Sequence, residues 1–163
     1  MEQIYQTYLN IIKNICTDSN DPVSVTPEQL PALANLAQEH CTVPFVLPCL
    51  RSASVYPSMK HQVKEMMLNY YQIEHFTRTT VSLLRENHID CYLLKGLSLA
   101  DCYPVPEYRK LGDLDLYLAE PEILSQAQTV LESSGYILQD ELSDHHVTYY
   151  YTFPKTGRRF ILE

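Results

Sequence analysis

The sequence has 163 residues, 45% of them apolar and 20% charged, which is typical of folded globular domains and excludes general disorder. This length suits one domain, or one domain with a helical extension. The net charge of −8 argues against sequence-blind binding of nucleic acid, and no apolar run reaches the roughly 18 residues of a membrane span.

The first half of the chain has the spacing of amphipathic helices. Isoleucines and Tyr8 recur at helical intervals and predict a first helix at about residues 2–16. Thr26 as N-cap and Pro27 at the first helical position predict a second helix that ends near residue 40. After the prolines of "VPFVLPCL", a third pattern predicts the longest helix, at about residues 57–87.

The second half changes to short β-rich runs. "IDCYLL" predicts a strand, "LSLADCY" about two helical turns, "DLDLYL" a second strand, "PEILSQAQTVLESSG" a helix and "YIL" a third strand. "HHVTYYYTF" and "RRFILE" flank "PKTG" and predict a hairpin. We therefore expect an α/β (α+β) fold, with a helical N-terminal region at residues 1–88 and a small mixed-sheet core at residues 89–163.

The N-terminus and the cysteines indicate a compartment. "MEQIYQTYLNIIKNIC" lacks the charged, apolar and cleavable pattern of a signal peptide, so we expect a cytoplasmic protein. The five cysteines are scattered and contain no Cys-x-x-Cys pair, which argues against a disulfide framework and against structural zinc.

Two carboxylates stand one residue apart in "YRKLGDLDLYL". Strand alternation puts Asp113, Asp115 and Tyr117 on one face and the intervening leucines on the other, with the two aspartate Cα atoms roughly 6 to 7 Å apart. A divalent cation between such carboxylates would relieve their repulsion and orient phosphate oxygens. Taken alone, the same pattern also fits two aspartates at a strand start that merely face water.

A second polar segment precedes the aspartates in "LLKGLSLADCY". Gly96 lets the backbone approach a ligand closely, and amides at the start of a helix attract phosphate. Lys95 adds a cation and Ser98 adds a hydroxyl. As a lone dipeptide, "KG" also fits an ordinary turn, but next to the acidic pair this segment predicts a phosphate site that faces a metal site.

The stretch "LLKGLSLADCYPVPEYRKLGDLDLYL" resembles the nucleotidyltransferase superfamily of the polymerase-β type, in particular the bacterial group of uncharacterised nucleotidyltransferases. That group also resembles toxin-type enzymes of abortive infection systems. The resemblance implies that Asp113 and Asp115 are catalytic metal ligands and that Lys95, Gly96 and Ser98 hold the phosphates. It further implies a triphosphate contact for Arg109.

The resemblance also implies a third carboxylate on a later strand, for which Glu163 in "RRFILE" is the candidate. The expected reaction moves a nucleoside monophosphate from a nucleoside triphosphate to an acceptor hydroxyl, with Mg²⁺ or Mn²⁺ as cofactor and pyrophosphate as product. The acceptor is open: a small molecule, a protein or an RNA. Members of the group continue beyond this strand, so we expect a truncated member.

Other hypotheses remain beside this one. A haloacid-dehalogenase-like phosphatase also uses Asp-x-Asp, but its apolar strand precedes the pair, whereas here it follows. A catalytically inactive nucleotide-binding or protein-interaction module with the same fold is the main alternative. Asp144, His145 and His146 are a weaker metal candidate. The many tyrosines predict cover for sheet and core rather than stacking on bases.

Overall fold

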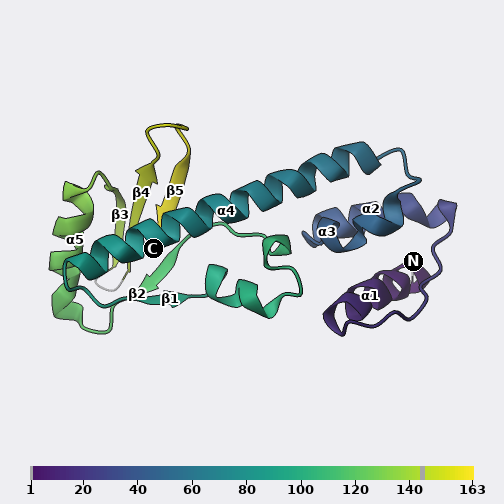
Figure 1. Ribbon diagram of the computed structural model, residues 1–163, viewed down its shortest axis with the longest axis horizontal. Coiled ribbons are helices and arrows are strands. Elements are labelled where there is room, and N and C mark those ends of the chain that lie inside the picture. Colours follow the sequence, from purple (N-terminus) through teal and green to yellow (C-terminus); the bar gives the residue numbers. More distant parts are fainter. Residues whose placement is uncertain (1, 144–145) are drawn as a thin grey trace. The chain divides into compact units, whose positions relative to one another are not determined.

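The computed structural model describes residues 2–143 and 146–163 of the chain (Figure 1). They divide into two compact units, of which one contains Met1–Leu68 and Asp101–Lys110 and the other contains Asn69–Ala100 and Leu111–Glu163. A helical N-terminal region precedes a region of antiparallel sheet, so the predicted mixed α and β fold is confirmed. The predicted boundary between residues 88 and 89 stays a prediction.

The first unit is built from helices. They are α1 (Glu2–Cys16), α2 (Leu30–Glu39), α3 (Val43–Val46) and the first part of α4 (Tyr56–Glu86). The three helices expected from periodicity are confirmed, and a short 3-10 helix, η1 (Pro27–Gln29), begins the second of them. None of the helices in the described part of the chain is long and apolar enough to cross a membrane.

Prolines explain the two short helices that the pattern did not predict. Both α3 and the 3-10 helix η2 (Leu47–Leu50) carry a proline in their first turn, where a backbone N–H has no helical partner and is not needed. Their apolar side chains are buried with those of α1 and α2 in the core of the first unit. A run that looks like a proline-rich loop therefore contributes to packing.

The strands lie in the second unit. They are β1 (Tyr92–Leu94), β2 (Asp115–Tyr117), β3 (Ile137–Ser143), β4 (His146–Thr152) and β5 (Arg159–Leu162). Within the described residues, β1 and β2 form one antiparallel sheet and β3, β4 and β5 form another. The hairpin predicted around "PKTG" is confirmed by the pairing of β4 with β5.

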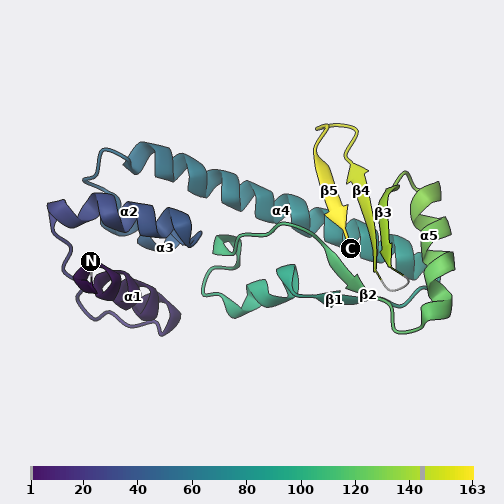
Figure 2. The ribbon, with the colours of Figure 1, turned by 180° about the vertical axis from the view of Figure 1, so that it is seen from behind.

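Parallel pairing joins the two sheets at β2 and β5. Leu114 forms a parallel bridge with Leu162. The Leu114 N–H donates to the Ile161 carbonyl at 3.0 Å, and the Glu163 N–H donates to the Leu114 carbonyl at 2.8 Å. The Leu116 N–H then donates to the Glu163 carbonyl at 2.8 Å. Seen from both sides, β5 ends next to β2 (Figure 2). The strand order is therefore β1-β2-β5-β4-β3, which is the predicted mixed sheet.

The core of the second unit lies between this sheet and two helices, the second part of α4 and α5 (Leu124–Ser133). Phe76 of α4 is 1% exposed, and its ring lies among those of Tyr136, Tyr151, Phe153 and Phe160 at centroid distances of 5.2 to 6.3 Å. These contacts hold α4 against the strands. Two of these rings, those of Tyr136 and Tyr151, belong to tyrosines that were predicted to cover sheet and core.

One of two local predictions needs correction. The two helical turns expected after "KG" are present as the 3-10 helix η3 (Gly96–Cys102), which ends before the prolines of "PVPE". The strand in "DLDLYL" is shorter than predicted, because only Asp115–Tyr117 pairs with β1 and Asp113 lies before it.

Replacing Phe76 by Ala tests this core. We expect Phe76→Ala to lower the free energy of unfolding by about 3 to 5 kcal/mol, because the ring is fully buried and the surrounding rings cannot close the cavity. Urea denaturation followed by circular dichroism measures the change. The control Leu68→Ala on the same helix removes a side chain that is 49% exposed and should cost less than about 0.5 kcal/mol. Equal losses in both variants would contradict this packing.

Candidate functional site

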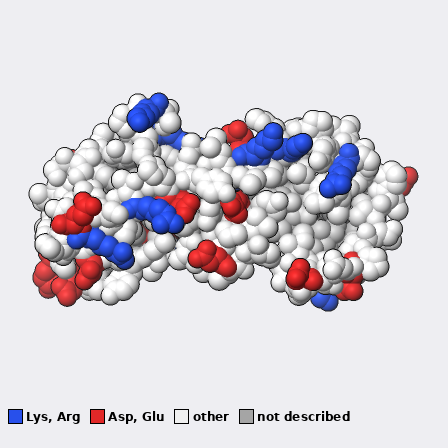
Figure 3. All heavy atoms as spheres, viewed as in Figure 1, with Lys and Arg blue, Asp and Glu red and all other residues white. Residues whose placement is uncertain are grey.

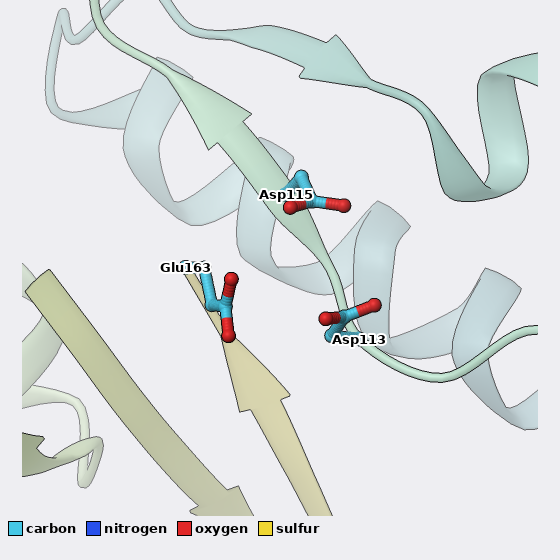
Figure 4. A group of neighbouring side chains, drawn as sticks. All are labelled: Asp113, Asp115 and Glu163. Atoms are coloured by element: carbon cyan, nitrogen blue, oxygen red, sulfur yellow. The ribbon is translucent and has the colours of Figure 1, made fainter. Parts of the chain in front are cut away.

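Three carboxylates meet where β2 lies beside β5. Among the described residues, Asp113, Asp115 and Glu163 each offer an oxygen, and these oxygens all lie within 4.8 Å of one another. Figure 4 shows Asp115 on β2, Asp113 on the segment that leads into it and Glu163 at the end of β5. Asp115 is buried, Glu163 is half-buried and Asp113 is exposed. The structure thus brings together the three residues predicted as metal ligands, and we call them the acidic triad.

The burial of two leucines explains why the triad forms. Leu114 and Leu162 are 2% and 4% exposed and face each other across the parallel bridge. Side chains alternate along a strand, so the neighbours of a buried leucine point to the opposite face. Asp113 and Asp115 flank Leu114, and Glu163 follows Leu162. Packing of the leucines therefore places all three carboxylates on the other side.

Lys95 lies against the triad. Its Nζ atom donates to Asp115 Oδ1 at 3.0 Å, an ion pair with an exposed lysine and a largely buried carboxylate. The pKa of Lys95 is raised, chiefly by this hydrogen bond and by the charge of Asp115, with smaller effects of Asp113 and Glu163. All three carboxylates thus act on one ammonium group. From the sequence, Lys95 was predicted only to bind phosphate. Its contact with Asp115 was missed, because no local sequence pattern indicates it.

The turn after β1 has an unusual backbone. Lys95 and Gly96 have φ angles of +48° and +36°, in the left-handed region that a glycine adopts at low cost and a lysine does not. A Cβ atom on Gly96 would lie 3.6 Å from the Asp113 carbonyl oxygen, so the turn runs directly beside the acidic segment. The Ser98 hydroxyl donates to the Lys95 carbonyl at 2.5 Å and fixes the turn.

Arg109 belongs to the first unit. It is half-buried, and its Nη1 donates to the Tyr103 hydroxyl at 3.1 Å while its guanidinium lies 5.4 Å from the centroid of that ring. Its predicted contact with a triphosphate stays a prediction. The weaker metal candidate of Asp144, His145 and His146 lies outside the described residues and side chains.

The triad fits a small divalent cation. Mg²⁺ prefers oxygen ligands at 2.0 to 2.1 Å in octahedral geometry, so two oxygens on one ion are roughly 3 to 4 Å apart. The oxygens of the triad all lie within 4.8 Å of one another, which is close to that spacing. Lys95 offsets only one of the three negative charges. The donor set is thus of the kind that Mg²⁺ or Mn²⁺ binds.

An apolar pocket of about 410 Å³ adjoins the site. Its wall includes Glu163, but most of it comes from apolar side chains such as Leu116, Leu118 and Leu124. By strand alternation, Leu116 and Leu118 belong to the face opposite Asp115. Most of the pocket wall therefore belongs to the core side of the sheet, although Tyr117 and Glu163 also line it.

Replacing Asp115 tests the ion pair. We expect Asp115→Asn to lower the pKa of Lys95 toward its ordinary value, as followed by NMR titration of the lysine ε-methylene signals. Because the folded-state pKa is raised, the stabilisation from this pair is present below the ordinary lysine pKa and is lost as the pH rises through the raised value. The control Asp101→Asn, at an exposed position of the first unit, should leave the titration unchanged. Identical titrations in both variants would argue against the contact.

The chain also matches a known family. Neither a curated protein nor a solved structure matches it significantly. The model of the family described as uncharacterised nucleotidyltransferase matches residues 26–163, a range that contains the acidic triad, Lys95 and Gly96. A match over this much of the chain shows that the protein belongs to the uncharacterised nucleotidyltransferase family.

Proposed function

We propose that this protein transfers a nucleoside monophosphate from a nucleoside triphosphate to an acceptor hydroxyl, using Mg²⁺ or Mn²⁺. The acceptor oxygen forms a bond to the α-phosphorus, the bond from that phosphorus to the bridging oxygen breaks, and pyrophosphate leaves. One observation carries the proposal: three carboxylates within 4.8 Å of one another lie beside a lysine-glycine turn. Membership of a nucleotidyltransferase family supports it.

In this proposal the acidic triad holds the metal. Asp113, Asp115 and Glu163 supply hard oxygen ligands, and the buried position of Asp115 strengthens its electrostatic interactions. When bound, the cation would offset charge on the phosphate oxygens and acidify the acceptor hydroxyl. In this proposal Glu163 would also accept the proton from that hydroxyl.

The lysine-glycine turn holds the leaving group in this proposal. The side chain of Lys95 is 70% exposed. If a divalent cation bound to Asp115, the ammonium group of Lys95 would be able to contact the phosphates instead of that carboxylate. Gly96 has no side chain between its backbone and the ligand, and Ser98 keeps the turn in shape through its bond to the Lys95 carbonyl. Arg109 is proposed as a further triphosphate contact.

The charge of the chain bears on the acceptor. On the face drawn in Figure 3, basic and acidic side chains are mixed rather than gathered into one basic stripe. Recognition along a nucleic-acid backbone needs many lysines and arginines together, and the net charge is −8. We therefore propose an acceptor that is recognised locally, as a small molecule, a protein side chain or one end of an RNA.

Metal binding tests the triad directly. We expect isothermal titration with Mn²⁺ to show one or two sites in the wild type and at least roughly tenfold weaker binding in Asp113→Asn, Asp115→Asn and Glu163→Gln. The matched controls Asp101→Asn and Glu122→Gln change exposed carboxylates elsewhere and should bind as the wild type does. Equal affinity in triad and control variants would exclude the triad as a metal site.

Turnover is tested separately from binding. We expect pyrophosphate release from at least one of ATP, GTP, CTP and UTP with Mg²⁺ and pooled acceptors, and a loss of about 100-fold or more in Asp115→Asn. Labelled α-phosphate should appear on the acceptor in equal amount to the pyrophosphate. Binding of nucleotide without any pyrophosphate release would favour the alternative, an inactive nucleotide-binding module.

A further inference from the structure

Two tyrosines form an exposed pair on the short sheet of the second unit. Tyr92 of β1 and Tyr117 of β2 are 59% and 52% exposed, although the sequence pattern predicts tyrosines in sheet and core. Their ring centroids are 6.5 Å apart and their planes are inclined by 44°, so neither ring covers the face of the other. About half of each tyrosine is therefore open to solvent.

The register places this pair on the face of Asp115. Tyr92 is directly opposite Tyr117, and Leu94 is directly opposite Asp115. Asp115 and Tyr117 are two residues apart on one strand, so their side chains share a face and their Cα atoms are roughly 6 to 7 Å apart. Tyr92 and Leu94 share that face for the same reason. The aromatic pair and the acidic triad thus belong to one continuous surface.

The strand order relates the positions of Tyr92 and Tyr117 to those of Lys95 and Glu163. Strand β2 lies between β1, which leads into Lys95, and β5, which leads into Glu163. With pyrophosphate on the Lys95 side and the acceptor on the Glu163 side, the proposed reaction axis runs across β2. The nucleoside would extend to one side of that axis, and the direction along β2 from Asp115 to Tyr117 is one such side.

We propose that Tyr92 and Tyr117 form the platform on which the base of the nucleoside triphosphate stacks. The inference rests on the proposed function and adds the base subsite to it. Stacking on an aromatic ring suits any base, because every base has a π face. The apolar pocket, which Tyr117 and Glu163 also line, is a poorer base site, since the leucines that form much of its wall belong to the opposite face of β2.

Comparison of two ligands tests the platform on the full chain. Isothermal titration with Mg²⁺ compares the tightest binder among ATP, GTP, CTP and UTP with inorganic tripolyphosphate, which has the phosphates but no base. We expect Tyr117→Ala and Tyr92→Ala to weaken nucleotide binding by roughly 5- to 150-fold. Their affinity for tripolyphosphate should stay at the wild-type value. Tyr117→Phe and Tyr92→Phe retain the ring and should bind the nucleotide almost normally.

The controls separate this platform from other roles. Tyr5→Ala changes a tyrosine of the first unit that is 47% exposed and should alter neither affinity. Nucleotide binding that is unchanged in the Tyr92→Ala, Tyr117→Ala and double variants would overturn the platform, as would a parallel loss of tripolyphosphate binding. A wild type that binds neither ligand would instead overturn the proposed function. A wild type that binds both equally would overturn the platform alone.

Discussion

The parallel bridge between Leu114 and Leu162 is the interaction on which the site depends. These residues are 48 positions apart, and their pairing joins a two-stranded and a three-stranded sheet. Because side chains alternate along both strands, burying the leucines on one face forces their charged neighbours onto the other. A shift of register by one residue would bury carboxylates and expose leucines. The hydrophobic core and the acidic triad are therefore fixed by the same backbone hydrogen bonds.

This arrangement holds like charges together at a cost. Three carboxylates whose oxygens lie within 4.8 Å repel one another, and one of them, Asp115, is buried. The exposed ammonium group of Lys95 reduces this repulsion. Lys95 itself has a positive φ angle, in the turn after β1. Both strained features, the crowded acids and the left-handed lysine, occur at the same place. Strain gathered in this way is common at binding sites, where a ligand relieves it.

The sequence predicted the elements better than their pairing. Period and end signals located α1, α4, the hairpin, and η1 together with α2 within a residue or two, because these depend on local spacing. The acidic residues were also identified from the sequence, Glu163 through family resemblance. The contact of Lys95 with Asp115 was missed, since it depends on how β1 pairs with β2 and on two positive φ angles. The prolines of α3 and η2 concealed helical turns whose apolar side chains pack in the core of the first unit.

The exposed tyrosines follow from the same sheet geometry. In the described chain β1 is an edge strand that pairs only with β2, so Tyr92 has a strand neighbour on one side only, and the alternation that turns Asp115 away from the core also turns Tyr117 away from it. The solvated face of an antiparallel sheet commonly carries polar residues. Two tyrosines and Leu94 there leave an apolar surface next to a charged one. A nucleotide has the same division, with a flat apolar base and a charged triphosphate, and this correspondence favours a nucleotide over a ligand that is only charged.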